Sequence, residues 1–482
     1  MSEFLLIAPV LLPLLGAPIA VLIGHGRAAW ALALVVSAAS AVSSLLLLPT
    51  VESGARHYHF GNWPAPFGIE YVLDAFNTPL LLLCSVAATL AILAALPRTL
   101  GPHLAARQGV FYALFLLCLA GLNGILSTGD AFNVFVFLEI SSLTTYGLVA
   151  SGRAPGSALG AFQYLILGTL GGSFVLLGIG LWFQSTGSLN MADIALRLPQ
   201  SAYPAVGIAG TVLLLLGFSL KGASFPLHQW LPAVYAAAPW PVTAFLAACA
   251  TKVALYALAR MAIGVGGLDG LGLELLGGIA LVGMLWGALA ATAQTDVRRL
   301  LAWSSVSQLA YILFAFSLGS AAGIAAAMAQ FFGHAAIKGG LFLGLGPLQK
   351  LEDLRGLRGT DPWRCALITL LVMGLIGVPL TAGFVAKWGL LSASFADGHG
   401  MGVGVILLSS LLAVIYGLRL LEPIWLQDGS QAPTEAGSRW TLLPAAGAVL
   451  IMFWLGTHDW AAEWGLRAAV SLGLGVNQGL NP

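Results

Sequence analysis

Lysine has an unusual distribution in this 482-residue sequence. Four of the five lysines lie inside long apolar stretches, whereas the arginines lie in loops or at the ends of such stretches. These four are Lys221, Lys252, Lys338 and Lys387. A lysine at the centre of a bilayer costs about 2.5–3.5 kcal/mol on insertion scales. Because a desolvated lysine can release its proton and arginine cannot, the choice of cation predicts groups that take up and release protons.

An acidic counter-charge and a histidine accompany these lysines. Glu139 lies centrally in an apolar run, where a carboxylate near a lysine forms an ion pair that can open and close. His334 is four residues before Lys338, so both side chains share one helix face, and a neutral histidine can relay a proton. Purely structural roles stay open for three of these residues. Glu139 could be a fixed ion-pair partner, Lys252 could extend its ammonium to the membrane–water interface, and His334 could be a packed histidine with satisfied hydrogen bonds.

Other polar residues near these groups carry weaker signals. Ser305, Ser307 and Gln308 could hold water between titratable groups. His228 is expected near the membrane surface, where a structural role is at least as well supported as a relay. Asp130 begins the helix of Glu139 and is interpreted mainly as a helix cap, with a place in the proton path as the alternative.

The composition identifies the class of protein that must position these residues. Only 8% of residues are charged and 59% are hydrophobic, with a mean hydropathy of +0.93. This excludes a soluble domain, a disordered chain, a coiled coil and a nucleic-acid-binding protein. Apolar runs of about 20 residues favour helices over a β-barrel. The four cysteines lie far apart with no metal-binding spacing, and no cofactor is predicted, with any metal site left undetermined.

The apolar runs predict an all-α polytopic membrane protein with about 14 transmembrane helices. The predicted spans are 4–24, 28–49, 75–96, 108–127, 131–150, 157–183, 204–231, 241–262, 271–292, 300–318, 322–347, 364–394, 402–424 and 440–457. Loops after odd-numbered spans carry twelve arginines and lysines, against four on the opposite side. The positive-inside rule therefore predicts that both termini lie on the outer side. The protein is expected in the cytoplasmic (inner) membrane.

Two five-helix units with inverted topology are predicted from a weak internal repeat. The stretch 170–174 aligns with 338–342, so that the fourth to eighth spans correspond to the ninth to thirteenth. The expected regions are helices 1–3 at 1–107, a first repeat at 108–262, a second at 271–424, and a C-terminal helix and tail at 440–482. Pro226 and Pro379 predict one broken helix in each repeat, freeing the carbonyls of Gly222 and Leu375.

Residues 110–395 resemble the antiporter-like subunits shared by respiratory complex I, membrane-bound hydrogenases and Mrp-type multisubunit cation/proton antiporters. The motifs follow the order of that family: TGDAFNVFVFLE, SLKGASFPLHQWLPAVYAAAP, AACATKVALYALAR, TDVRRLLAWSSVSQLAYI, FGHAAIKGGLFL and GVPLTAGFVAKW. Three motifs are most similar to those of the D-type subunits of Mrp antiporters: GDAFNVFVFLE, the Thr251-Lys252-Val253 triplet with Tyr256, and VSQ at 306–308. One departure is Leu380, which stands where many members have a second proline.

The resemblance implies a non-redox, proton-translocating subunit of a hetero-oligomeric membrane complex that exchanges H⁺ for a monovalent cation, with Na⁺ expected. It implies a proton path over Glu139, Lys221, Lys252, His334, Lys338 and Lys387. The alternative within the family is a proton-pumping subunit of a complex I-like oxidoreductase or a membrane-bound hydrogenase. Two further hypotheses are a stand-alone transporter of a small organic solute and a passive scaffold, and both explain the lysine row less well.

Overall fold

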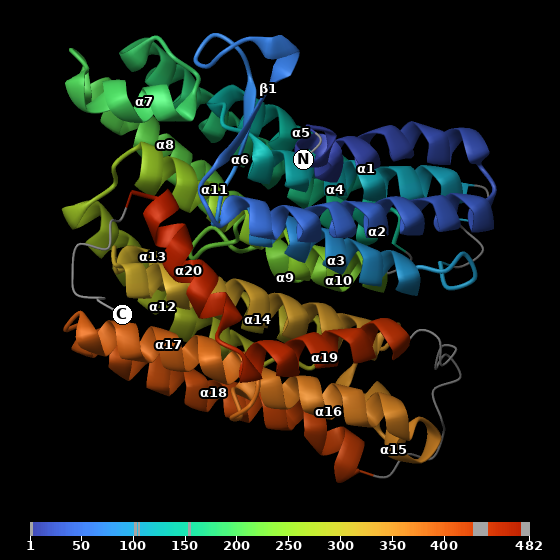
Figure 1. Cartoon of the computed structure of the whole chain (residues 1–482). Coiled ribbons are helices and arrows are strands. Elements are labelled where there is room, and N and C mark those ends of the chain that lie inside the picture. The colour runs from blue at the N-terminus through green and yellow to red at the C-terminus, as the bar shows by residue number, and fades with distance from the viewer. Residues whose placement is uncertain (1–2, 101–103, 105–106, 153–155, 428–441, 474–482) are drawn as a thin grey trace.

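The computed structural model describes residues 3–100, 104, 107–152, 156–427 and 442–473. Within these ranges ten helices are long and apolar enough to cross a membrane, and three shorter apolar helices accompany them. In Figure 1 these helices lie roughly side by side in one bundle, with the hairpin strand β1 at one end. The structure is therefore that of a multi-pass helical membrane protein, as the composition predicts.

Each predicted span overlaps at least one helix of the described residues, and the spans 204–231, 241–262 and 364–394 each include more than one element. The first half of the chain contains α1 (Phe4–Ile23), α2 (Gly26–Val51), α3 (Thr78–Ala94), α4 (Gln108–Ser127), α5 (Ala131–Ala150), α6 (Ser157–Thr186), α8 (Pro204–Lys221), α9 (Trp230–Ala237), α10 (Trp240–Ala248) and α11 (Ala250–Leu258), which continues into the π-helix η4 (Ala259–Val265). The second half contains α12 (Gly270–Thr292), α13 (Val297–Ser317), α14 (Ala321–Leu345), α16 (Pro362–Ile376), α17 (Ala382–Ala396), α18 (Gly400–Trp425) and α19 (Leu443–Thr457). The start of the last predicted span, 440–441, and the tail at 474–482 lie outside the described residues.

Several elements escaped the sequence prediction. The linker 50–74 forms an antiparallel hairpin of β1 (Arg56–His59) and β2 (Glu70–Leu73), so the chain is not purely helical. The short helices are α7 (Met191–Arg197), the 3₁₀ turns η1 (Phe60–Asn62), η3 (Leu198–Gln200) and η5 (Leu351–Leu354), and α15 (Leu357–Thr360). Helix α20 (Trp460–Ser471) follows α19 and was missed because it is amphipathic rather than uniformly apolar.

Two helix pairs interrupt the regular bundle. Residues 222–229 separate α8 from α9, and residues 377–381 separate α16 from α17. Pro226 and Pro379, from which the broken helices were predicted, lie in these breaks. In the second break Leu380 has a φ of +72°, a conformation closed to proline, which fits the absence of a second proline there.

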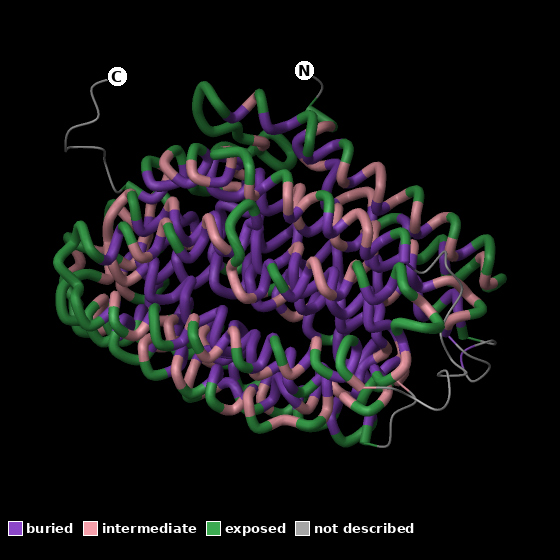
Figure 2. Tube along the Cα trace, turned by 90° about the horizontal axis from the view of Figure 1, so that it is seen from below, coloured by how far each residue is buried: buried purple, intermediate pink, exposed green. Residues whose placement is uncertain are grey.

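Twice along the chain, three long helices are followed by a broken helix pair and then by further helical residues. The first series runs from α4 through α8 and α9 to α10 and α11, and the second from α12 through α16 and α17 to α18. Helix α14 lies at the centre of the bundle, in contact with α10, α13, α16, α17, α19 and α20. Figure 2 shows that buried residues fill the interior of the bundle, while exposed ones lie mainly at its periphery.

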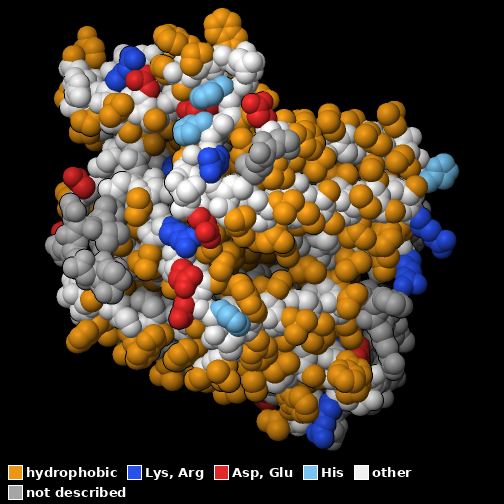
Figure 3. Space-filling view, in the orientation of Figure 1, with side chains coloured by type: hydrophobic (Ala, Val, Ile, Leu, Met, Phe, Trp, Pro, Cys, Tyr) orange, Lys and Arg blue, Asp and Glu red, His pale blue; other side chains and the backbone are white. Residues whose placement is uncertain are grey.

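Helix ends and helix surfaces explain why the chain folds this way. Side chains of Asp130, Asp296, Ser320 and Thr381 accept hydrogen bonds from the third backbone N–H of the helices that follow them. Large hydrophobic side chains cover the face shown in Figure 3, while charged side chains gather mainly toward the ends of the bundle. This distribution suits a hydrocarbon surround, because unpaired charges are expelled toward the interfaces.

Candidate functional site: a row of buried lysines

The first part of the site joins α5 and α8 through Glu139 and Lys221. The Nζ of Lys221, the last residue of α8, is 3.9 Å from Oε1 of Glu139. It also donates a hydrogen bond of 2.6 Å to Oγ of Ser142 and a longer one of 3.5 Å to the hydroxyl of Tyr146. Since Ser142 and Tyr146 lie three and seven residues after Glu139, one face of α5 supplies every one of these oxygens.

Two glycines of α6 make room for this pair. A Cβ at Gly172 would collide with Oε1 of Glu139, and one at Gly168 would collide with the hydroxyl of Tyr146. Gly171, between them, packs against the backbone and side chains of α8. Gly171 therefore allows close helix packing, whereas Gly168 and Gly172 create the space that the polar side chains occupy.

Lys252 lies on α11 beside a break in the helix. Cys249, between α10 and α11, has φ −123° and ψ −56°, which interrupts the helical hydrogen-bond ladder. The Nζ of Lys252 donates a 2.6 Å hydrogen bond to the carbonyl of Ala247, just before this break. Only 1% of Lys252 is exposed, so it is a buried group rather than one that reaches the interface.

His334 and Lys338 lie on the central helix α14 and are both buried. The Nζ of Lys338 donates to the carbonyl of Leu301, at 3.0 Å, and to the hydroxyl of Ser304. Neither ring nitrogen of His334 hydrogen-bonds to a described residue. The histidine lies close enough to Lys252 and Lys338 to interact electrostatically with both, so it connects two lysines from different helices.

Lys387 lies on α17 and continues the row. Its Nζ donates hydrogen bonds to the carbonyls of Ile376, at 2.8 Å, and Leu375, at 3.2 Å. These carbonyls end α16, where the helix dipole favours a cation. Leu375 is the residue whose carbonyl Pro379 was expected to free. The charge of Lys387 also acts on Lys338, so the row extends from Lys252 to Lys387.

The polar residues of α13 that were expected to hold water near the lysines lie at different distances from the row. Ser305 donates to the carbonyl of Leu301, which also accepts from Lys338, whereas Ser307 donates to Met284 on α12, away from the lysines. Gln308 accepts a 2.7 Å hydrogen bond from Gln330 of α14. The sequence interpretation missed Ser142, Tyr146 and Ser304, the hydroxyl partners of the lysines. The spacing of Ser142 and Tyr146 from Glu139 was the available signal.

Asp130 acts as the cap of α5, as its position indicated. Its Oδ1 accepts a 2.8 Å hydrogen bond from the N–H of Asn133. Burial raises the pKa of this carboxyl above its ordinary value, and hydrogen bonds from the backbone of Asn133 and Phe132 oppose the rise. Asp130 also forms a backbone bridge to Asn190, which ties the start of α5 to α7.

Two cavities adjoin the titratable residues. A cavity of about 590 Å³ lies at the break between α8 and α9. Its lining residues are Phe225, Pro226, His228, Gln229, Pro232, Ala233, Trp286, Gln294, Arg299 and Trp303. A second cavity of about 30 Å³ lies between Lys221 with Ser142 on one side and Ala250 of α11 on the other, enough for about one water molecule.

The described residues were also compared with the requirements of a metal site. Within those residues no cluster of three or more His, Cys, Asp or Glu side chains could hold an ion. The groups of the row are the ammonium groups of the lysines, the half-buried carboxylate of Glu139, the imidazole of His334, and their hydroxyl and carbonyl partners.

The fold and this buried row define a multi-pass membrane protein of the antiporter-like type. A family model described as NADH:quinone oxidoreductase/Mrp antiporter, transmembrane, matches residues 128–413, and the chain belongs to this family. The match covers more than half of the chain, from the start of α5 to α18.

Relatives that belong to two different kinds of membrane complex are similar in sequence to this chain. The chain is 38% identical over 440 residues to the N subunit of the NADH-quinone oxidoreductase of Desulforudis audaxviator, covering 87% of this chain and 86% of the relative. It is 29% identical over 427 residues to the D-type subunit of the Na(+)/H(+) antiporter of Alkalihalophilus pseudofirmus, covering 86% and 85%. A chain in the structure of the Mrp complex from Dietzia sp. superimposes with a TM-score of 0.89 at 26% identity, covering 98% of this chain and all of that one.

Proposed function

We propose that this chain is the proton-translocating subunit of a multisubunit monovalent cation (Na⁺)/H⁺ antiporter. The observation that carries the proposal is the pair of buried Lys221 and half-buried Glu139, followed by a row of buried lysines that continues to Lys387. The relative from the Na(+)/H(+) antiporter and the likeness to the Mrp complex support an antiporter as the setting. The remaining subunits of that complex are the expected partners.

The proposed mechanism begins at the ion pair. The ammonium of Lys221 lies 2.6 Å from Ser142 and 3.9 Å from Glu139, so it is close to the carboxylate without full contact. A small movement of either side chain would tighten or open the pair. Because the carboxylate favours the charged lysine, tightening would hold the proton on Lys221 and opening would release it.

The proton then passes along the buried row. Lys252 exchanges with His334 and Lys338, and Lys387 is the terminal donor or acceptor. The carbonyls and hydroxyls around each ammonium stabilise its charged form, while burial favours the neutral form. This balance allows a lysine to change protonation state, which an arginine in the same place would not do.

Water access is proposed at the broken helices. The cavity of about 590 Å³ reaches His228 and Gln229 from the α12–α13 end, where Gln294 and Arg299 also line it. One half-channel would enter here and the other at the break of α16 and α17. The two units at 108–262 and 271–424, inverted relative to each other, are part of this proposal, as are outer termini and an inner-membrane location.

The site of the transported cation is a separate question. Na⁺ prefers oxygen ligands, and a row of ammonium groups repels it. We propose that this chain carries the proton part of the exchange and that Na⁺ passes elsewhere in the complex.

A second function is favoured by one specific observation. The 38% identity to the N subunit of an NADH-quinone oxidoreductase exceeds the 29% identity to the antiporter relative. The same residues would then form the proton path of a redox-driven pump, with the redox groups on other chains.

The test separates these two functions by the partners. The tagged chain, expressed in its own cells, is purified in mild detergent, and co-purifying proteins are identified by mass spectrometry. Several small hydrophobic subunits without redox proteins, together with Na⁺-dependent pH changes in everted vesicles, support the antiporter. Iron–sulfur or nickel proteins in the same fraction would support the redox-driven pump instead. Recovery of the chain alone, with no pH change, would contradict both.

A further inference from the structure

The segment that carries Lys252 is irregular at both ends. Helix α11 begins at the break around Cys249 and passes into the π-helix η4. Such π-helical turns occur frequently at functional sites. Lys252, Tyr256 and Arg260 follow one another at intervals of four residues, so they occupy one face of this segment. A short helix between two irregular ends needs other contacts to fix its position.

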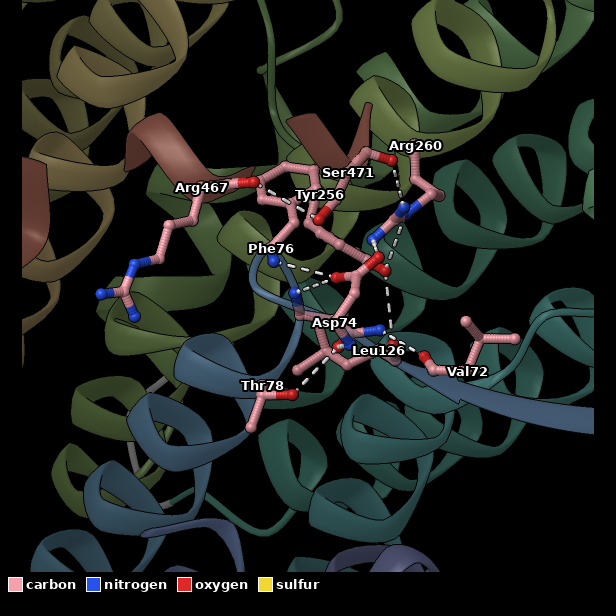
Figure 4. A network of polar contacts seen from close by, with 10 residues as sticks. Val72, Asp74, Phe76, Thr78, Leu126, Tyr256, Arg260, Arg467 and Ser471 are labelled. Atoms are coloured by element: carbon pink, nitrogen blue, oxygen red, sulfur yellow. Dashed lines mark hydrogen bonds and ion pairs between the residues drawn. The ribbon is translucent and has the colours of Figure 1, made fainter. Parts of the chain in front are cut away.

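Arg260 supplies these contacts through all three of its nitrogens (Figure 4). Nη2 donates a 2.6 Å hydrogen bond to Oδ2 of Asp74, and Nε donates one of 3.2 Å to the hydroxyl of Tyr256. Nη1 donates to the carbonyl of Ser471 in the last turn of α20, also at 3.2 Å. The hydroxyl of Tyr256 in turn donates to the carbonyl of Leu126 in α4. One guanidinium therefore joins three distant segments of the chain.

The carboxylate that Arg260 meets is itself held rigidly. Oδ1 of Asp74 accepts hydrogen bonds from the N–H groups of Phe76 and Asn77. Oδ1 of Asn77 accepts a hydrogen bond from the N–H of Asp74, and the amide nitrogen of Asn77 donates one to the carbonyl of Val72. The side chains of Asp74 and Arg260 are 8% and 16% exposed, so their ion pair is largely shielded from solvent.

The contact with α20 links this network to the other half of the row. Helix α20 packs on α14: Gly465 lies against the backbone of Ala325, and Trp460 meets Phe332 edge-on. Helix α14 carries His334 and Lys338. Through Arg260, the helix of Lys252 and the helix of His334 are therefore tied to a common element.

We propose that Asp74, Tyr256 and Arg260 form a positioning clamp that holds Lys252 in line with His334 for proton transfer. This inference rests on the proposed function of the lysine row. Two physical effects carry it. The clamp fixes the position of α11, and Asp74 neutralises a permanent charge about 12 Å along the helix from Lys252. Without Asp74, an uncompensated guanidinium would oppose a second positive charge on the same helix face.

A second ion pair on α20 provides the matched control. Arg467 contacts Glu52 at 3.0 Å and so also ties α20 to the N-terminal helices, yet both side chains are about half exposed. An exposed pair contributes little to stability. Arg467→Gln removes this tie of α20 but leaves the contacts of α11 intact. It therefore tests whether loosening α20 alone is enough to lower transport.

The experiment measures proton transport in everted vesicles that contain the whole complex, normalised to the amount of chain and of co-purified partners. Asp74→Asn is expected to lower the maximal rate about tenfold or more, because it leaves the buried guanidinium unpaired. Asp74→Glu should restore much of the rate. Arg467→Gln should stay within about twofold of the parent chain. Normal rates with Asp74→Asn, or equal losses with Asp74→Asn and Arg467→Gln, would overturn the clamp.

A second measurement does not depend on transport. Cys249 is buried three residues before Lys252 and reports on the position of α11. In a chain whose other cysteines, Cys84, Cys118 and Cys365, are replaced by serine, a small thiol reagent should label Cys249 slowly, and several-fold faster after Tyr256→Phe or Asp74→Asn. Tyr256→Phe removes one hydroxyl and serves if Asp74→Asn does not accumulate. Unchanged labelling with both variants would overturn the clamp, whereas a parent complex that moves no protons would contradict the proposed function alone.

Discussion

The two broken helices hold a buried ammonium in different ways. At the first break, Lys221 ends α8 and faces the carboxylate of Glu139 and the hydroxyl of Ser142, both side-chain groups of α5. At the second break, Lys387 lies one turn into α17 and donates to the main-chain carbonyls that end α16. The first lysine is thus held by a counter-charge, and the second by the dipole of a helix end.

This difference indicates which end of the row can be switched. The carboxylate of Glu139 lies on another helix and can move away from Lys221. The ammonium of Lys221 then loses the attraction of a full negative charge. The carbonyls of Leu375 and Ile376 are part of the backbone and keep their partial charges in any protonation state. In the proposed mechanism, the first break therefore starts a transfer, and the second is a site of steady proton affinity.

The largest expected effect comes from removing the counter-charge. Glu139→Ala or Lys221→Ala should lower transport by about two orders of magnitude while assembly stays intact, because the switch is lost and the remaining partner is left unpaired. The measurement is proton transport in everted vesicles, with the chain and its partners quantified. Glu274→Gln, an exposed carboxylate on α12, is the control and should transport normally. Full activity in Glu139→Ala would show that the carboxylate is only a structural partner.

Transport should also be lost when the charge of Lys387 at the second break is made permanent, but for a different reason. Lys387→Arg keeps a cation beside the end of α16 but cannot release its proton, so transport should fall about tenfold or more. The same vesicle assay measures this variant. The complex should still assemble, since the helix dipole accepts either cation. A fully active arginine variant would mean that Lys387 supplies only a fixed charge.

A smaller effect is expected from shifting Glu139 without changing it. In Gly172→Ala the added Cβ would collide with the carboxylate, so Glu139 must move and transport should fall about three- to tenfold. Gly180→Ala lies on the same helix with no atom within 4 Å of the new Cβ and should leave the rate unchanged. Equal rates for the two variants, measured side by side, would argue against a defined carboxylate position.

The smallest effect should follow the loss of one hydroxyl. Ser142→Ala removes the 2.6 Å hydrogen bond to Lys221 and should lower the rate about two- to fivefold. Ser173→Ala removes a hydroxyl that bonds only within its own helix and is the control. An effect as large as that of Glu139→Ala would transfer the switching role from the carboxylate to the serine.

Much of the fold was predictable because its signals are local. Apolar runs define membrane helices by their length, and Pro226 and Pro379 locate the two breaks. The amphipathic α20 and the hairpin of β1 and β2 were missed, since neither is long and uniformly apolar. The hairpin also pairs with the end of α4, through a bridge between Tyr71 and Thr128 that no local pattern shows.

By itself, the sequence determined which cations are buried: placing four lysines inside apolar runs leaves them no route to water except through the protein. Only the tertiary structure decided their partners. Ser304 rather than Ser307 meets Lys338, and Asp74 meets Arg260 across 186 residues of chain. These contacts depend on the rotation and packing of whole helices, which are set by small residues such as Gly172 and Gly465 acting over many elements at once.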